Sequence, residues 1–158
     1  MVASNRSCPL WLVAITIAQI LLSGGCDKGG STVTRGKLSY NAADVFGEGT
    51  PALALAKAAG RGDSKAIHKS VADGVNVNTV GKYEITPLWW AAWNNNFNGF
   101  VALLDNGANP NAQRKERYPI MHLVTQMNDS RFLEAALKHG GDPDLRDNQS
   151  GETPLFPA

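Results

Sequence analysis

The feature of this sequence that most constrains the fold is a repeat of 33 residues. Three segments align along the chain: VADGVNVN, LDNGANPN and LKHGGDPD. Their glycines are Gly74, Gly107 and Gly140, each 33 residues after the one before, and a polar residue follows two positions later in all three. One such unit cannot bury an apolar face alone, so a period of this length predicts a stacked array of units.

The middle unit predicts two helices joined by a turn. Thr86 is a favourable N-cap, and Pro87 suits the first helical position, where its missing N–H does no harm. The following FNGFVALLDNG has apolar residues at helical spacing and ends at Gly107, which suits a left-handed position after a helix. The asparagines after it can bond their own backbone in a tight turn. Each unit is expected to be helix, turn, helix and extended loop.

These segments resemble ankyrin repeats. The family's Thr-Pro-Leu-His, Ala-Ala and Gly-Ala-Asp-Val-Asn elements correspond to TPLWWAA and NGANPN, with ADGVNVN and HGGDPD as variants. The resemblance covers about Thr50 to the C-terminal end. It implies an all-α solenoid of about three repeats and an incomplete fourth, GETPLFPA, where the chain is expected to be truncated because nothing follows to cap the third unit.

Three positions depart from the family pattern. Trp89 replaces the usual histidine, so the loop hydrogen bond of that imidazole is expected to be missing in the middle unit, whereas His122 stands at the equivalent place in the next. Thr50 and Pro51 lie three residues early, which predicts a longer first helix in the first unit.

The first 25 residues have the order of a secretory signal peptide. Arg6 is followed by an apolar run over residues 10–22 and then by small residues. The run is too short to cross a bilayer comfortably, since a spanning helix needs about 20 apolar residues. A buried N-terminal helix is the alternative, which the lack of a helical period disfavours.

The ending LLSGGC resembles a bacterial lipobox, in which the cysteine is lipidated after cleavage. The resemblance implies a lipid anchor on Cys26, although Ser23 departs from the commonest pattern; release of a soluble product is the alternative. Asp27 resembles a signal for retention in the inner membrane. Cys8 would leave with the signal, so no thiol pair would remain for a disulfide.

These features predict three parts: a signal peptide (1–25), a flexible spacer (26–47) and an ankyrin-repeat domain (48–158). The spacer is expected because DKGGSTVTRGK is rich in Gly, Ser and Thr. Fifteen basic and fourteen acidic residues give a net charge of +1, which is no electrostatic signature of nucleic-acid binding.

The sequence predicts a protein that is not an enzyme and has no cofactor, metal site or small-molecule substrate. His68 and His139 are expected at helix surfaces, and His122 is expected to hold a loop. No serine or cysteine stands near them in a nucleophile motif. The acidic run DPDLRDN lacks the glycine and distal glutamate of a calcium loop, and GRGD is interpreted as a turn between helices.

Ankyrin repeats bind partners through loop tips and the exposed side of their first helices. By register, the resemblance implies contact residues in two units: Lys82, Tyr83, Ile85, Trp90, Trp93 and Asn94, then Lys115, Glu116, Tyr118, Gln126 and Met127. Their aromatic and charged character suits an interface. The alternatives are that Trp90 and Trp93 pack in the core, and that RKER is a solvated loop tip.

The sequence therefore predicts a membrane-anchored periplasmic module that binds another protein. Its layout resembles ankyrin lipoproteins of Gram-negative bacteria, some of which are immunity proteins against phospholipase effectors of type VI secretion systems. This resemblance implies an inhibitor of a secreted lipase effector. The alternative is an envelope scaffold, or a stress-related ankyrin protein, without a toxin partner; fold alone does not decide between them.

Overall fold

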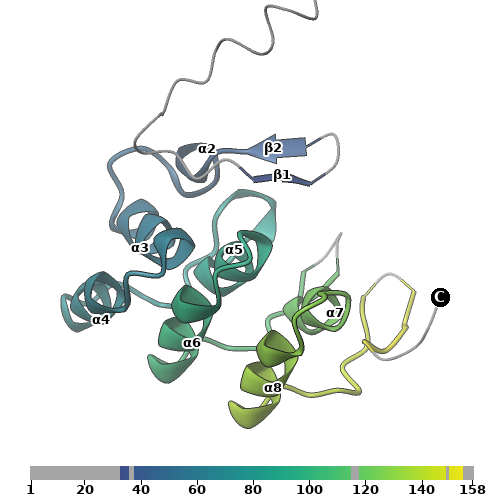
Figure 1. Ribbon diagram of the computed structural model, residues 1–158. Coiled ribbons are helices and arrows are strands. Elements are labelled where there is room, and N and C mark those ends of the chain that lie inside the picture. Colours follow the sequence, from purple (N-terminus) through teal and green to yellow (C-terminus); the bar gives the residue numbers. More distant parts are fainter. Residues whose placement is uncertain (1–32, 36–37, 115–117, 149, 155–158) are drawn as a thin grey trace, which may run out of the picture.

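The computed structural model describes residues 33–35, 38–114, 118–148 and 150–154 and consists mainly of stacked helix pairs (Figure 1). The three pairs are α3 and α4, α5 and α6, and α7 and α8. Their bounds are Pro51–Arg61, Ser64–Ala72, Pro87–Trp93, Phe97–Asp105, Ile120–Thr125 and Ser130–Lys138. First helices form one layer and second helices the other, so each pair covers its neighbour. The expected all-α solenoid is confirmed.

The first helices of the first two units begin as the sequence predicts. Thr50 accepts a hydrogen bond from the Leu53 N–H at 3.1 Å, and Thr86 accepts one from the Trp89 N–H at 3.2 Å. A proline occupies the next position in both. The early cap at Thr50 gives α3 11 residues against 7 in α5, which confirms the longer leading helix.

The second helices begin at polar caps as well. Asp129 accepts from the Arg131 N–H at 3.1 Å at the start of α8. The side-chain hydrogen bond from Arg131 also holds the pKa of the Asp129 carboxyl below its usual value. Each unit therefore contains a polar side chain that caps a helix start and does not need contacts with the neighbouring units.

Close packing between the first two units depends on a glycine. A Cβ on Gly99 of α6 would lie 2.0 Å from the carbonyl oxygen of Ala59 in α3. Ala58, Ala59, Ala91 and Ala92 are all buried, so small residues line the helix contacts. The buried apolar residues form one continuous cluster that runs through the successive helix pairs, from Ala42 to Ala136.

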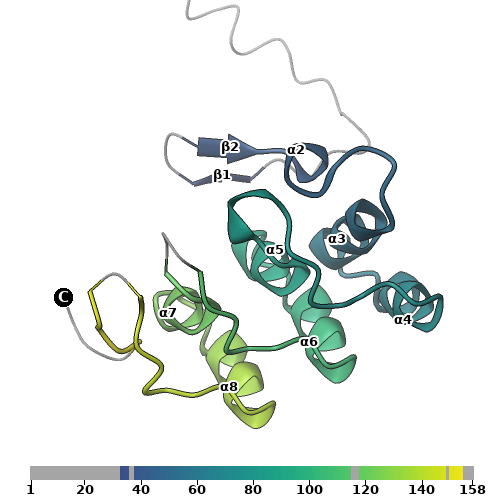
Figure 2. The same ribbon diagram turned by 180° about the vertical axis from the view of Figure 1, so that it is seen from behind.

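An additional element precedes the repeats. Strands β1 (Val33–Arg35) and β2 (Leu38–Tyr40) form an antiparallel hairpin, followed by the short helix α2 (Ala42–Phe46) (Figure 2). Val45 and Phe46 are buried, and the Phe46 and Trp90 rings pack at nearly right angles, with centroids 6.2 Å apart. Part of the segment expected to be a spacer thus packs on the solenoid, so the folded part begins before residue 48.

The glycine turns are left-handed, as predicted. The φ angles of Gly74, Gly107 and Gly140 are 90°, 83° and 84°. The asparagines that follow them link neighbouring units: Asn78 accepts from the Asn109 N–H, and Asn111 accepts from the Asp142 N–H, both at 2.8 Å. We call this row of inter-repeat hydrogen bonds the asparagine ladder.

The segment after α8 returns to α7. His122 Nε2 lies 3.0 Å from the carbonyl oxygen of Glu152, and the Thr125 hydroxyl donates to the carbonyl of Pro154 at 3.0 Å. The predicted loop-holding role of His122 is confirmed. Residues 155–158 of the expected fourth unit lie outside the described residues.

The expected signal peptide and Cys26 also lie outside the described residues. Within the described ranges, no helix has the length and apolar character needed to cross a bilayer.

Candidate protein-binding surface

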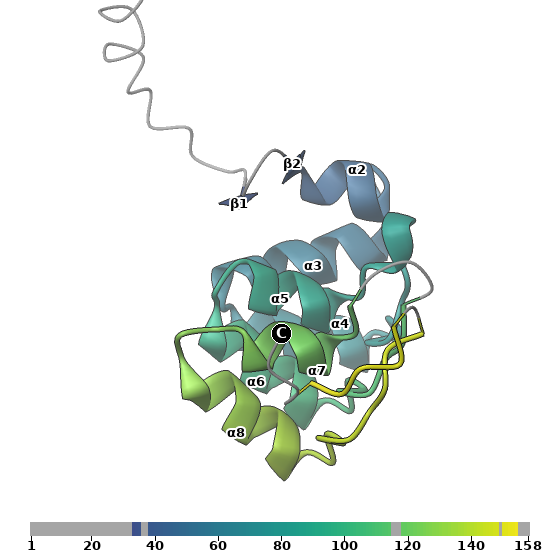
Figure 3. The ribbon, with the colours of Figure 1, turned by 90° about the vertical axis from the view of Figure 1, so that its right-hand side faces the viewer.

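Two loops carry three of the four exposed large hydrophobic side chains in the described part of the chain. We call residues 79–86 the α5 finger and the described residues 112–114 and 118–119 the α7 finger, because each precedes that helix. Both lie on one side of the helix layers (Figure 3). In the described part of the chain four large hydrophobic side chains are exposed, and three are on these fingers: Val80 at 61%, Tyr83 at 59% and Tyr118 at 52%. The fourth, Leu137, lies on α8.

The tip of the α5 finger is a tight turn, η1 (Lys82–Glu84). The Gly81 N–H donates to the carbonyl of Ile85 at 2.8 Å, and the Ile85 N–H donates to the carbonyl of Lys82 at 3.3 Å. Between them, Tyr83 and Glu84 have φ angles of 58° and 56°, the left-handed region that non-glycine residues disfavour. The base of this turn lies against α2, because a Cβ on Gly81 would lie 2.7 Å from the carbonyl oxygen of Val45.

A buried cation lies behind this tip. Arg114, in the α7 finger, is only 4% exposed, and its Nη2 donates to the carbonyl of Tyr83. Its guanidinium lies 4.7 Å from the ring centroid of Trp89. Trp89 in turn stacks on Trp93, with centroids 4.9 Å apart and planes 15° apart. The two fingers are therefore joined through an arginine and a tryptophan pair.

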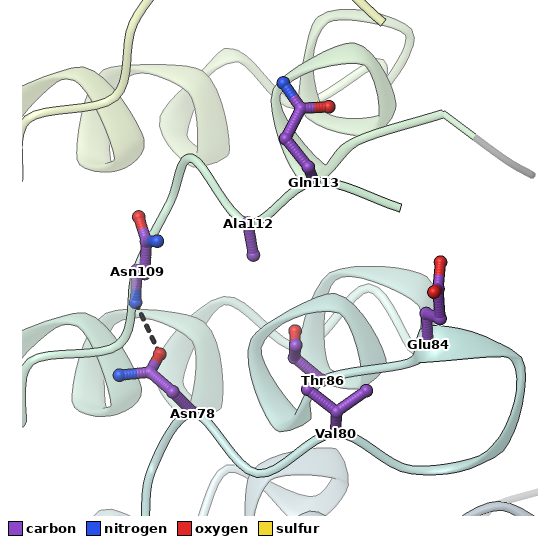
Figure 4. A pocket seen from close by; sticks show the side chains of 7 residues that line it. All are labelled: Asn78, Val80, Glu84, Thr86, Asn109, Ala112 and Gln113. Carbon is purple, nitrogen blue, oxygen red and sulfur yellow. Dashed lines mark hydrogen bonds between the residues drawn. The ribbon is translucent and has the colours of Figure 1, made fainter. Parts of the chain in front are cut away.

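A pocket of about 370 Å³ lies between the bases of the two fingers (Figure 4). Amide side chains provide most of its polar groups, and Glu84 provides a carboxylate. Its lining residues are Asn78, Val80, Glu84, Thr86, Asn109, Ala112 and Gln113. Asn78 uses both of its amide atoms within the chain, so among the described residues the amide atoms that remain for a polar ligand group beside exposed Val80 are the Asn109 Nδ2 and the Gln113 Oε1.

The predicted contact residues differ in exposure. Lys82, Tyr83, Tyr118 and Gln126 are exposed, and Trp93, Asn94 and Met127 are half-buried. Lys115 and Glu116 lie outside the described residues. For the exposed and half-buried residues, contact with a partner stays a prediction.

Two of the predicted contacts are corrected by the structure. Ile85 and Trp90 both have 0% exposure. Ile85 follows the finger tip and turns inward, and Trp90 is covered by Phe46 of α2. A side chain without accessible surface cannot touch a partner, so both belong to the core, as the alternative for Trp90 anticipated.

Sequence reasoning missed Val80 and Arg114. Val80 could have been found, because it is an apolar residue in an otherwise polar loop, NTVGKYE. Arg114 gave no such signal. It belongs to a run of charges that was interpreted as a solvated loop tip or partner contact, and its partners are 25 or more positions away along the chain.

Among the described residues, no group of three or more His, Cys, Asp or Glu side chains is arranged to hold a metal ion. The surface is built from aromatic, amide and charged groups, which suits recognition of another macromolecule.

Comparison with known proteins agrees with this architecture. Residues 83–115 match the family described as Ankyrin repeat. Over 111 residues the chain is 32% identical to Protein PhlB of Serratia liquefaciens; the aligned part is 70% of this chain and 48% of that protein. The chain thus spans about half the length of this relative. The stacked helix pairs, the glycine turns and these matches identify the chain as an ankyrin-repeat protein.

Proposed function

We propose that the chain binds another protein through the α5 and α7 fingers, and that it acts as an immunity-type inhibitor of a secreted lipase effector. The observation that carries the binding proposal is the exposure of Val80, Tyr83 and Tyr118 on adjacent fingers. Ankyrin repeats are protein-interaction modules, which supports this role.

The chemistry of the fingers favours a protein partner. Tyrosine and tryptophan supply much of the binding energy at interfaces, because they bury a large rigid surface and keep a polar group for hydrogen bonding. Tyr83 and Tyr118 are exposed, and half-buried Trp93 lies on the adjoining helix. The pocket between the fingers adds the Asn109 Nδ2 and the Gln113 Oε1, which can fix the orientation of the partner.

The inhibitory role rests on the resemblance to ankyrin lipoproteins. A lipobox-like LLSGGC at Cys26 and a following spacer would hold the fingers at the periplasmic side of a membrane, where a delivered lipase acts. A solenoid that covers the active site or the membrane-docking face of such an enzyme would inhibit it without any catalytic group of its own.

The test is an inhibition assay with a captured partner. The tagged full chain is recovered from membranes of the source cells, and any stoichiometric partner is assayed for phospholipid hydrolysis. We expect inhibition that is complete near a 1:1 ratio and is relieved by the double substitution Tyr83→Ala and Tyr118→Ala. Leu137→Ala removes another exposed apolar side chain, 42% exposed and on α8, and is expected to inhibit like wild type.

The outcomes separate the candidate functions. A partner without lipase activity that still depends on Tyr83 and Tyr118 would support the envelope scaffold instead of the immunity role. A partner that binds the double variant as tightly as wild type would contradict the finger surface. Circular dichroism of each variant checks that the helices remain folded.

A further inference from the structure

The tip of the α5 finger has a backbone conformation that its own residues disfavour. Tyr83 and Glu84 are consecutive left-handed residues, and turns of this kind normally have Asn or Gly at both positions. L residues disfavour this geometry, since Cβ crowds the backbone when φ is positive. A contact from outside the turn must therefore contribute to holding it.

Arg114 is placed to make that contact. Its guanidinium comes from the next finger, 31 residues further along the chain, and donates to the carbonyl of Tyr83. It is 4% exposed, and arginine is almost never buried unless its charge is compensated. A hydrogen bond from a charged donor is stronger than one from a neutral donor, so this contact restrains the turn effectively.

A second contact fixes the orientation of the Arg114 side chain. The guanidinium lies over the Trp89 ring at 4.7 Å, in a cation–π arrangement. Trp89 stacks on Trp93, and its backbone N–H is bonded to the cap Thr86, so the ring is anchored to α5. Arg114 thus links the rigid helix to the strained tip.

The equivalent register position in the last unit also bonds a turn. Thirty-three residues after Arg114 stands Asp147, which is 6% exposed and accepts from the N–H groups of Ser150 and Gly151 at 2.6 and 2.8 Å. Asp147 bonds the turn that directly follows it, whereas Arg114 bonds the α5 finger turn of the preceding unit. A buried charge at this position fastens a turn in both units.

We infer that Arg114 is a positioning residue that fixes the tip of the α5 finger and with it the outward presentation of Tyr83. The use of this tip in partner binding rests on the proposed function; the fixing itself does not. A tip that is already ordered loses less conformational entropy on binding than a mobile one, so the arrangement favours affinity.

The test reads the tip without any partner. In the full chain, hydrogen exchange of the Gly81 and Ile85 amides reports the two bonds that close the turn. Arg114→Gln is expected to raise both rates about 10- to 30-fold, in line with the loss of a hydrogen bond to a charged group. Arg146→Gln is the matched control, because Arg146 also donates to a loop carbonyl, that of Gly151 at 2.8 Å.

A second substitution separates positioning from general packing. Adding Glu84→Gly to Arg114→Gln is expected to bring both rates back to within about threefold of wild type, because glycine is favoured at the second central position of such a turn. Unchanged rates in Arg114→Gln would overturn the inference. So would a rise throughout α5 and α6 that Glu84→Gly does not reverse, because Arg114 would then only fill the core.

Binding to the partner captured in the inhibition assay is measured separately. Arg114→Gln is expected to weaken it about tenfold, with recovery in the double variant, as expected for lost preorganisation. If the exchange rates of the Gly81 and Ile85 amides change as described while the affinity for the partner stays constant, the role of Arg114 is upheld. The proposed use of this tip by the partner is then contradicted.

Discussion

Asn78 and Asn109 join two successive repeats through a single amide side chain. The Oδ1 of Asn78 accepts from the backbone N–H of Asn109 at 2.8 Å, while its Nδ2 donates to the carbonyl of Gly107 at 3.1 Å. Asn111 repeats both bonds one unit later, to Asp142 and Gly140. Cohesion between units is therefore partly polar, and this part of it lies on the turns next to the second helices, in addition to the Arg114 bond between the fingers.

Removal of one rung of the asparagine ladder is expected to weaken the stack measurably. Asn111→Ala breaks two inter-repeat hydrogen bonds and should lower the free energy of unfolding by about 1–2 kcal/mol. Urea denaturation measures this change. Asn98→Ala, at an exposed position on α6, is the control and should stay within about 0.5 kcal/mol of wild type. Equal stability of Asn111→Ala and the control would show that the ladder contributes nothing.

Gly99 is expected to tolerate no side chain. Alanine at this helical position would gain about 1 kcal/mol of helix propensity. Its Cβ would nevertheless lie 2.0 Å from the Ala59 carbonyl oxygen, so helices α3 and α6 must separate, at a cost of about 1–3 kcal/mol or more. Net destabilisation in urea is the expected result.

Gly107→Ala gives a useful comparison for Gly99. Nothing lies within 4 Å of a Cβ at Gly107, but its φ is 83°. Only backbone strain of about 1–2 kcal/mol is expected there. A Gly99→Ala protein that is as stable as wild type would mean that the two helices are not in the described contact.

Trp90 is expected to be a stability residue without a role in binding. Trp90→Ala removes a fully buried ring and should cost about 3–5 kcal/mol of unfolding free energy. Trp90→Phe is the matched control: among the described residues the Trp90 Nε1–H has no acceptor, so its loss should cost less than about 1.5 kcal/mol. Weaker partner binding by a fully folded Trp90→Phe protein would argue against a pure core role.

Tyr83 and Tyr118 are expected to matter for binding and not for folding. Each replacement by alanine should weaken partner affinity by about 2 kcal/mol, roughly 30-fold, as is typical of an interface hot spot. Unfolding free energies should change little, since both side chains are more than half exposed. Calorimetric titration with the captured partner measures the first effect, and urea denaturation the second. A loss of stability equal to the loss of affinity would make both residues structural.

The lipid anchor is tested at Cys26. Cys26→Ser should move the chain from the membrane fraction to the soluble fraction of fractionated cells, because the acylated side chain is lost. Cys8→Ser changes the other cysteine, within the expected signal peptide, and should leave the protein in the membrane fraction. A Cys26→Ser protein that is processed and still membrane-bound would rule out this anchor.

The parts of the fold that could be predicted depend on local rules. The caps at Thr50 and Thr86 and the left-handed glycines follow from residue type and from a fixed period. The inward turn of Ile85 could not be predicted, because register alone does not say which side of a finger faces the core. The packing of Phe46 on Trp90 joins residues 44 positions apart and has no repeat to indicate it.

The candidate site, too, could be predicted only in part from the sequence. Tyr83 and Tyr118 could be found because the family places its contacts at loop tips. Arg114 could not be found, since the sequence RKER has the appearance of solvated charge. Arg114 packs against the Trp89 ring, where the family has histidine, and donates to the backbone carbonyl of Tyr83 in the left-handed turn. Both contacts are tertiary and join residues that are 25 and 31 positions apart along the chain.

The most direct test of the account is site-specific photo-cross-linking in the source cells. A photoreactive amino acid replaces Tyr83 in one strain and Leu137 in another, two exposed positions that lie on a finger and on α8. The account predicts a covalent adduct with a lipase effector from position 83 and none from position 137. An adduct from position 137 without one from position 83, or no adduct from either, would contradict the claim that the fingers bind this partner.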